Sequence, residues 1–179
     1  MAEALRIAIV GAESTGKSVL SQALVARLGA DTGLRCSLVP EYLREWCNRE
    51  GRTPRPDEQR GIARAQQARI DEAAARHDLV VCDATALMVA VYSRLLFQDE
   101  SLVPEVMAWH RTMDATLLTA LDIPWHSDPL RDGPHVREPV DGLVRQLLIE
   151  HGIAFSLVSG QGEARLASAL DALTPLLAD

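Results

Sequence analysis

The sequence predicts an α/β fold in which a five-stranded parallel sheet is flanked by helices. Five short apolar runs alternate with longer stretches in which apolar residues recur at helical spacing. A glycine-rich turn joins the first apolar run to the first helical stretch, as is typical of phosphate-binding folds. The length of 179 residues and the 47% of hydrophobic residues suit one domain with a real core, so we expect residues 1–179 to form a single domain.

The expected strands and helices alternate along the chain. Continuous apolar runs of this length are typical of buried parallel strands, and they occur at 5–10, 37–39, 79–82, 116–121 and 155–158. Helices are expected at 18–28 with Gly29 as C-cap, through Tyr42 and Trp46, at 57–76 with Asp57 as cap, and at 86–97, 104–113, 140–151 and 162–177. The segment 123–139 carries four prolines among charged residues and is expected to be a loop.

The ends of these strands carry the polar residues of interest. Gly11, Glu41, Asp83 and the loop 123–139 each follow an expected strand. Because ligands of open parallel sheets bind beyond the carboxyl ends of the strands, we expect these segments to meet at one edge of the sheet.

Composition and charge exclude some classes of protein. The formal net charge is −7, which argues against a nucleic-acid or membrane-surface partner, since both require a basic face. Three cysteines cannot all pair and form no CxxC motif, which favours reduced thiols. The chain shows neither a signal peptide nor an apolar run of the ~18 residues that a membrane helix needs. These observations predict a cytoplasmic protein.

The turn 11–18 reads GAESTGKS and matches the pattern GxxxxGK[ST] in full, which predicts a P-loop NTPase. Its backbone N–H groups and the following helix N-terminus would surround the phosphates of ATP. Lys17, the only lysine among 18 basic side chains, would contact the β- and γ-phosphates, and Ser18 would hold Mg²⁺. The candidate nucleotide-binding residues are Gly11, Glu13, Ser14, Thr15, Gly16, Lys17 and Ser18.

Among P-loop proteins, a compact phosphotransferase fits the sequence best. The single asparagine, Asn48, is not followed by lysine, and no DxxG occurs, which disfavours a GTPase switch. A motor or remodelling ATPase generally needs a longer chain. One alternative is a regulatory ATP-binding module whose hydrolysis gates a protein partner. A nucleic-acid-end kinase is a third possibility, and the acidic balance disfavours it.

Candidate catalytic residues lie near the expected strand ends and in the loop. Glu41 and Asp83 are the candidates to accept the proton of the acceptor hydroxyl, and Asp83 could instead hold Mg²⁺ in a Walker-B-like role. Arg131 and Arg137 could bring positive charge from a lid loop to the phosphates, as could Arg44. For each carboxylate the alternative is a helix cap or turn residue, and for each arginine a solvated position.

Aromatic residues are scarce, and three of them are near the expected edge. Tyr42, Trp46 and Trp125 could stack on a flat ring of the acceptor, although core packing explains them equally well. Gln66 could hydrogen-bond a base-like amide, or be solvated. The five histidines lack metal-ligand spacing, so we expect surface or local hydrogen-bonding roles.

Taken together, these motifs resemble the ribosylnicotinamide kinase domain of NadR-type proteins over about residues 5–175. The similar segments are 11–18, Glu-Tyr-x-Arg-Glu at 41–45, the helix from Asp57 to Gln66, Asp-Ala-Thr at 83–85, and Pro-Trp-x-x-Asp-Pro-Leu-Arg-Asp at 124–132. The resemblance implies a kinase fold related to nucleoside and nucleotide kinases and to AAA-type ATPases.

The resemblance also implies an activity. It implies that ATP and Mg²⁺ are used to phosphorylate the 5′-hydroxyl of nicotinamide riboside, a step of NAD biosynthesis. It implies that Glu41 and Asp83 lie near the ribose and the metal and that Arg131 belongs to the lid. The sequence contains no HxGH-like signature, so we expect none of the adenylyltransferase activity that full NadR-type proteins combine with the kinase.

Overall fold

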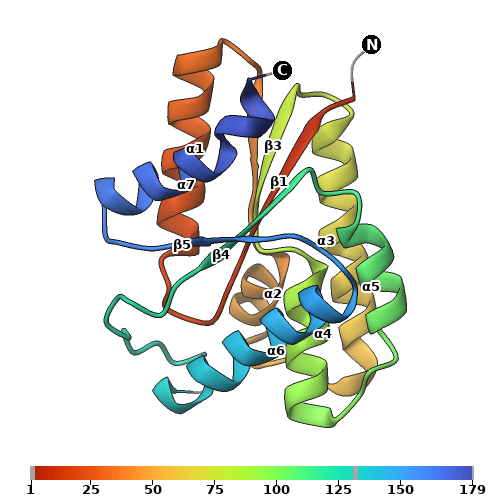
Figure 1. Ribbon diagram of the computed structural model, residues 1–179. Helices are drawn as coiled ribbons and strands as arrows, with labels where there is room; N and C mark the ends of the chain where they lie inside the picture. The colour runs from red at the N-terminus through yellow and green to blue at the C-terminus, as the bar shows by residue number, and fades with distance from the viewer. Residues whose placement is uncertain (1–2, 131–132, 179) are drawn as a thin grey trace.

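The computed structural model describes residues 3–130 and 133–178 and contains one five-stranded parallel sheet (Figure 1). The strands are β1 (Leu5–Val10), β2 (Cys36–Val39), β3 (Leu79–Asp83), β4 (Ala115–Thr119) and β5 (Ser156–Val158). Their order across the sheet is β2-β3-β1-β4-β5, and every neighbouring pair is parallel. The predicted fold class is therefore confirmed.

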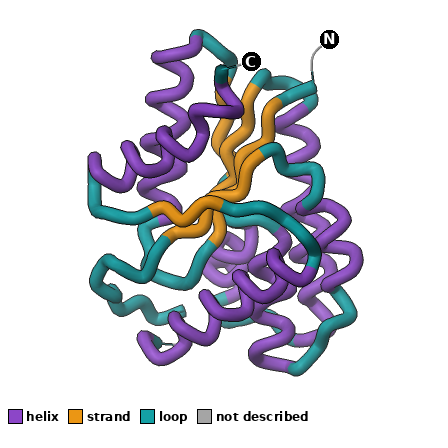
Figure 2. Tube along the Cα trace, in the orientation of Figure 1, coloured by secondary structure: helices purple, strands orange, loops and turns teal. Residues whose placement is uncertain are grey.

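Seven α-helices lie within the described residues and cover both faces of the sheet. They are α1 (Lys17–Thr32), α2 (Tyr42–Glu50), α3 (Gln59–Ala74), α4 (Ala86–Phe97), α5 (Val103–His110), α6 (Arg137–Glu150) and α7 (Glu163–Leu177). Helices α1 and α7 lie together on one side of the strands, whereas α3 to α6 lie on the other, as Figures 1 and 2 show. None of these helices is long and apolar enough to cross a membrane.

Alternation along the strands directs buried side chains to both faces of the sheet, where the described residues form three apolar clusters. Ile7 and Ile9 of β1 and Leu117 of β4 point to α1 and α7, where they pack in one buried cluster. Val80 and Cys82 of β3 point to the opposite face and pack against α3. Because both faces are covered, the strands need apolar residues at nearly every position, which explains the continuous runs in the sequence.

Several predicted boundaries were wrong for local reasons. Helix α1 does not end at Gly29 but continues to Gly33, whose N–H bonds the Gly29 carbonyl at 3.1 Å. Asp57 does not cap α3, because Pro56–Glu58 form a 3-10 turn in which the Glu58 carboxylate accepts the Arg55 N–H at 2.8 Å. The helix expected over 104–113 ends at His110.

The loop expected over 123–139 is shorter than predicted. A 3-10 turn over Pro134–Val136 leads into α6 at Arg137, and Pro139 lies in the first turn of that helix. A proline there costs little, because the first N–H groups of a helix have no partner within it. The residues 120–136, here named the lid connection, join β4 to α6. Arg131, predicted to be catalytic, lies outside the described residues.

A buried histidine joins β4 to the turn after β3. His110 is 2% exposed, and its ring nitrogens lie 3.2 Å from Thr85 Oγ1 and 3.0 Å from Thr116 Oγ1. Burial lowers the pKa of His110 from 6.5 to about 4, because a charged imidazolium would lose its hydration. This histidine therefore has the local hydrogen-bonding role expected from the sequence.

We expect this histidine to make folding stability depend on pH. Between pH 6.5 and 4 the unfolded chain binds a proton that folded His110 refuses, so stability falls as the pH falls through this window. The loss integrates to about 3 kcal/mol. Urea unfolding at pH 7.5 and pH 4.5 should show a smaller loss in His110→Gln than in the wild type. His135→Gln, at an exposed position, is the control and should behave like the wild type; an equal loss in all three proteins would contradict the expectation.

Candidate functional site

The P-loop opens onto a cavity of about 300 Å³. The P-loop and the start of α1 line it, together with residues of α2, the segment between α2 and α3, the start of α3, and α4. Its lining residues include Lys17, Ser18, Glu41, Arg44, Gln59 and Tyr92. A volume of this size lies at the lower end of the range for small-molecule sites.

The P-loop backbone is held by the neighbouring strand β4. The Thr15 hydroxyl donates to the Ala12 carbonyl at 2.8 Å and lies 2.7 Å from the Thr119 hydroxyl, which bonds the Val10 carbonyl at 3.3 Å. Thr15 and Thr119 are fully buried. Gly11 has φ +151°, and a Cβ atom there would overlap the Thr119 hydroxyl. The loop therefore depends on glycine at position 11.

We expect Gly11→Ala to destabilise the protein by about 3 kcal/mol, from backbone strain and the collision with Thr119. Gly51→Ala is the matched control, because Gly51 also has a positive φ but nothing lies within 4 Å of its added Cβ. Thermal unfolding of both variants separates collision from strain. Thr119→Ala added to Gly11→Ala should recover part of the loss; equal destabilisation by the two glycine variants would contradict the collision.

Lys17 lies at the start of α1, directly after the left-handed Gly16 that caps the helix. Its ammonium group donates to the Ala12 carbonyl at 2.8 Å, so it is folded back over the loop that it follows. An arginine fork is wider and planar, whereas the slim ammonium fits the tight turn as a point charge. The residue lines the cavity and can contact an anionic group placed in it.

Ser18 and Asp83 come together across the sheet edge. The Ser18 hydroxyl donates to Asp83 Oδ2 at 2.6 Å, which joins the start of α1 to the last residue of β3. Asp83 is 6% exposed, and its second oxygen, Oδ1, has no hydrogen-bond partner among the described residues. A buried carboxylate oxygen without a donor beside a serine hydroxyl fits Mg²⁺, which prefers oxygen ligands and commonly combines one or two carboxylates with substrate phosphates.

Glu41 and Arg44 bring opposite charges to the cavity from the start of α2. Glu41 occupies the N-cap position, and Arg44 follows within the first turn. Arg44 forms an ion pair with Asp128 of the lid connection, and Asp128 Oδ1 also accepts the Leu130 N–H at 2.9 Å. Asp128 belongs to the motif at 124–132, and its pairing with Arg44 appears only in the structure.

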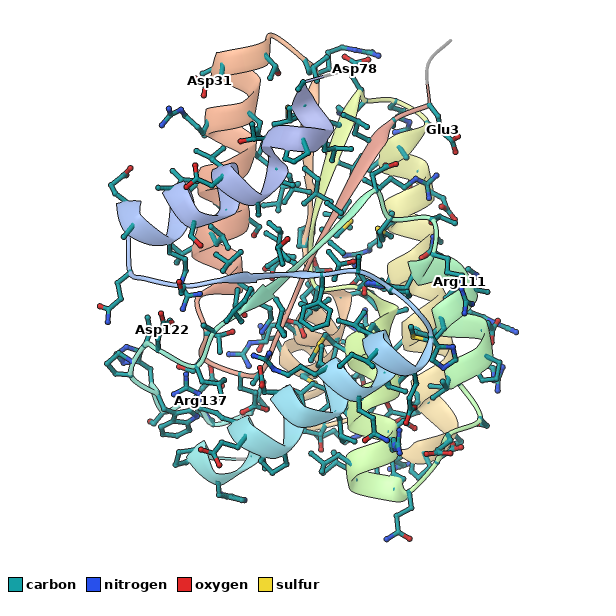
Figure 3. The ribbon with its side chains drawn as sticks, viewed as in Figure 1. Glu3, Asp31, Asp78, Arg111, Asp122 and Arg137 are labelled. Atoms are coloured by element: carbon teal, nitrogen blue, oxygen red, sulfur yellow. The ribbon has the colours of Figure 1, made fainter. Side chains whose placement is uncertain are left out.

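The lid connection lies against the P-loop at two further points. The His126 N–H donates to the Ser14 hydroxyl at 2.8 Å. Arg137, at the start of α6, donates to the Ile123 carbonyl at 2.9 Å and to the Ser14 carbonyl at 3.5 Å. Figure 3 shows Arg137 and Asp122 on the side of the molecule where the lid connection runs. Arg137 thus lies beside the P-loop, and its role toward the phosphates stays a prediction.

Beside Asp83, four residues predicted to bind the acceptor do not line this cavity. Tyr42 packs its ring against Arg69, whose guanidinium lies 4.5 Å from the ring centre, and buried Trp46 has Arg52 at 4.9 Å. Gln66 accepts the Tyr42 N–H at 2.7 Å and donates to the Pro40 carbonyl at 3.3 Å, so it holds the β2–α2 turn. The fourth, Trp125, belongs to the lid connection. For Tyr42 and Trp46 the contacts favour the packing alternative.

A protein-family model described as an AAA domain matches residues 6–165 of the chain. The chain belongs to this AAA domain family. A search of the curated proteins found no match. The AAA domain assignment agrees with the complete P-loop motif and with the parallel sheet order described above.

Solved structures share the fold of this AAA domain. A NadR protein in complex with NAD and AMP-PNP is similar with a TM-score of 0.76 and 21% identity, over 98% of this chain and 50% of that one. A NadR protein in complex with NR is similar with a TM-score of 0.77 and 19% identity, over 96% of this chain and 50% of that one. The chain thus spans about half the length of these two NadR chains, and it has the fold of a NadR-like P-loop kinase domain.

Two kinases of matching length have the same fold. Thymidylate kinase from Ehrlichia chaffeensis gives a TM-score of 0.68 at 13% identity, over 98% of this chain and 100% of that one. Deoxyadenosine kinase from M. mycoides, with the products dCMP and dCDP bound, has a TM-score of 0.63 and 14% identity, over 96% of this chain and 100% of that one. At these identities the likeness shows the fold alone.

Nine lining residues of this AAA domain were not predicted from the sequence. Three of them are Cys47 of α2, Gln59 of α3 and Tyr92 of α4. Tyr92 could have been noticed as the polar-tipped aromatic residue of an otherwise apolar helix, and its hydroxyl lies 3.5 Å from Glu13 Oε1. Gln59 lies in the segment from Asp57 to Gln66 that carries the family resemblance, but its residue type alone did not single it out, because glutamines on helices are common.

Proposed function

We propose that this protein is an ATP- and Mg²⁺-dependent kinase that phosphorylates the 5′-hydroxyl of a small nucleoside. The observation that carries the proposal is the shared cavity: the P-loop, Glu41 and Arg44 line one space large enough for a small acceptor. A P-loop module that only binds ATP needs no such space beside its phosphates. The nucleoside and nucleotide kinases that share the fold support the same class of reaction.

Nicotinamide riboside is the proposed acceptor. The motifs at 11–18, 41–45, 83–85 and 124–132 support it, and so does the shared fold of a NadR protein that binds NR. The reaction would yield the mononucleotide and place the protein in NAD biosynthesis in the cytoplasm. We further infer that residues 1–179 act as one kinase domain and that the loop 123–139 acts as its lid.

The proposed reaction moves one phosphoryl group. The acceptor hydroxyl gives its proton to the carboxylate of Glu41, its oxygen bonds the γ-phosphorus, and the bond from that phosphorus to the β-phosphate oxygen breaks to release ADP. Lys17 binds the β- and γ-phosphates and neutralises their charge. Arg44 and Arg137 add positive charge near the transferring group, and Arg131 of the lid is proposed to join them.

Ser18 and Asp83 would hold the metal in this scheme. When bound, Mg²⁺ would supply positive charge to the phosphates of ATP. The Ser18 hydroxyl, which donates to Asp83 in this structure, would turn its oxygen toward the ion, and the Asp83 carboxylate would help to hold it. The lid connection, tied to Ser14 and Arg44, would exclude water from the phosphates and limit ATP hydrolysis.

Acceptor-dependent ADP formation tests the proposal. Purified protein would be incubated with labelled ATP, Mg²⁺ and a panel of nucleosides that includes nicotinamide riboside, with the mass of each product recorded. We expect a phosphorylated nucleoside and an equal amount of ADP. Absence of transfer across the panel, with ATP hydrolysis stimulated by a protein partner only, would instead favour a regulatory ATPase.

A further inference from the structure

The cavity contains one deeply buried polar side chain that the proposed reaction does not use. Gln59 is the first residue of α3 and is 2% exposed, yet it lines the cavity. It follows the proline-rich segment 53–58 between α2 and α3, and Pro54 is a neighbour in the cavity wall. An uncharged polar side chain that is buried at a ligand-sized cavity requires a hydrogen-bonding explanation.

The hydrogen bond of Gln59 determines which way its amide points. The Nε2 atom donates to the Pro54 carbonyl at 3.4 Å. A carbonyl can only accept a hydrogen bond, so the amide nitrogen, and not the amide oxygen, must face Pro54. The Oε1 atom is therefore the free end of the side chain, and it has no hydrogen-bond partner among the described residues.

The cavity offers apolar surface as well as polar groups. Leu43, Pro54, Leu96 and Leu130 are among its lining residues, and the Pro54 carbonyl is the group that Gln59 bonds. Apolar walls with one buried carbonyl oxygen suit a planar base that carries an N–H or O–H group. A buried acceptor left without a donor costs free energy, and a ligand that supplies the donor removes that cost.

We propose that Gln59 is the residue that selects the acceptor, and that its Oε1 accepts a hydrogen bond from a donor on the base. This inference rests on the proposed kinase function and deepens it. The substrate class is a nucleoside whose base bears an amide or amino N–H donor and carries no negative charge at that position. A carboxamide fits this description, whereas a carboxylate in the same place would set one acceptor oxygen against another.

Selection of the acceptor follows because leaving a buried polar atom unpaired costs more free energy than a buried hydrogen bond gains. Sites that hydrogen-bond a substrate group reject an analogue lacking that group far more strongly than apolar pockets reject a missing methylene. An analogue of equal shape without the donor leaves Oε1 dehydrated and unpaired. We therefore expect a preference of about 10- to 100-fold in kcat/KM for the donor-bearing member of an isosteric pair.

Wild-type protein provides the first test, with nucleosides matched in shape. The central pair is nicotinamide riboside and 3-acetylpyridine riboside, which differ by an NH₂ and a CH₃ group and carry the same charge. Nicotinic acid riboside adds a carboxylate. Adenosine with purine riboside repeats the donor comparison on another base. The expected result is that the donor-bearing member is preferred within whichever pair is phosphorylated.

Variants provide the second test. Gln59→Met keeps the length of the side chain and removes the oxygen. The ratio of kcat/KM between the donor-bearing and the donor-free nucleoside should therefore fall close to 1, with the donor-free nucleoside still phosphorylated. Gln67→Met is the matched control, because Gln67 is also buried on α3, donates to Asp71 at 3.0 Å and does not line the cavity. It should keep the wild-type preference. Thermal unfolding of both variants reports whether they fold.

The outcomes separate the inference from the proposed function. Equal kcat/KM within a pair in the wild type, or an unchanged preference in folded Gln59→Met, would overturn the role of Gln59 and leave the kinase function standing. If no nucleoside is phosphorylated, the kinase proposal fails, and calorimetric binding of the same pairs still decides the inference. Tighter binding of the donor-bearing member then supports it, and equal binding of both members overturns it.

Discussion

Lys17→Ala is expected to lower the rate of phosphoryl transfer by about 1,000-fold while the protein remains folded. Removing one preorganised positive group from a site of developing charge costs this much in comparable enzymes. The folded state should survive, because Lys17 is only half-buried and lines the cavity, outside the buried cores of the sheet. Steady-state kinetics with a saturating acceptor, together with thermal unfolding, would measure both quantities.

A conservative variant makes the test sharper. Lys17→Arg retains the charge but replaces a point charge by a planar fork, so we expect it to be nearly as slow as Lys17→Ala. Because Lys17 is the only lysine, an amine-reactive label can modify no other side-chain amine of the chain, and ATP should protect it. Wild-type turnover in Lys17→Ala would refute the phosphate assignment.

The second large effect is expected at Asp83, where the side chain joins β3 to the start of α1. Asp83→Asn keeps an oxygen that can accept from Ser18 but replaces the other oxygen by an NH₂ group that cannot serve a metal. We expect the Mg²⁺ concentration for half-maximal activity to rise about 10- to 100-fold. Titration of activity with Mg²⁺ measures this shift, and excess Mg²⁺ should restore part of the rate.

Glu41→Gln distinguishes proton transfer from metal support. If Glu41 takes the acceptor proton, its amide should lower kcat by about 100- to 10,000-fold, and no Mg²⁺ concentration should restore it. Rescue of Glu41→Gln by Mg²⁺, with no rescue of Asp83→Asn, would exchange the two roles. The pair therefore assigns each carboxylate independently of the other.

The fold could be read from the sequence to a large extent. The continuous apolar runs at β1 and β3 indicate strands buried on both faces, and only a parallel sheet covered by helices on both sides satisfies that requirement. The ends of the helices were less predictable. Asp57 and Gly29 are residues of types that commonly cap helices, but in this protein neighbouring residues provide the caps. Glu58 bonds the Arg55 N–H, and Gly33 ends α1.

The residues of the candidate site were also predictable from the sequence only in part. The P-loop and the carboxylates at strand ends are recognisable because their spacing reflects backbone geometry that is local in the chain. Tyr42 and Gln66 were reasonable candidates by residue type, yet the cation–π contact with Arg69 and the hydrogen bonds to the β2–α2 turn occupy them. No local pattern distinguishes them from Gln59, which reaches the cavity.

Lys17 and the glycines around it were determined by the sequence alone, because a tight turn at a helix N-terminus is built from adjacent residues. The pairing of Arg44 with Asp128, the bond between Ser18 and Asp83, and the inward position of Gln59 were decided only by the tertiary structure. These contacts join segments far apart in the chain, and their geometry depends on how helices pack on the sheet. Packing of this kind is set by many side chains at once and leaves no periodic signal in the sequence.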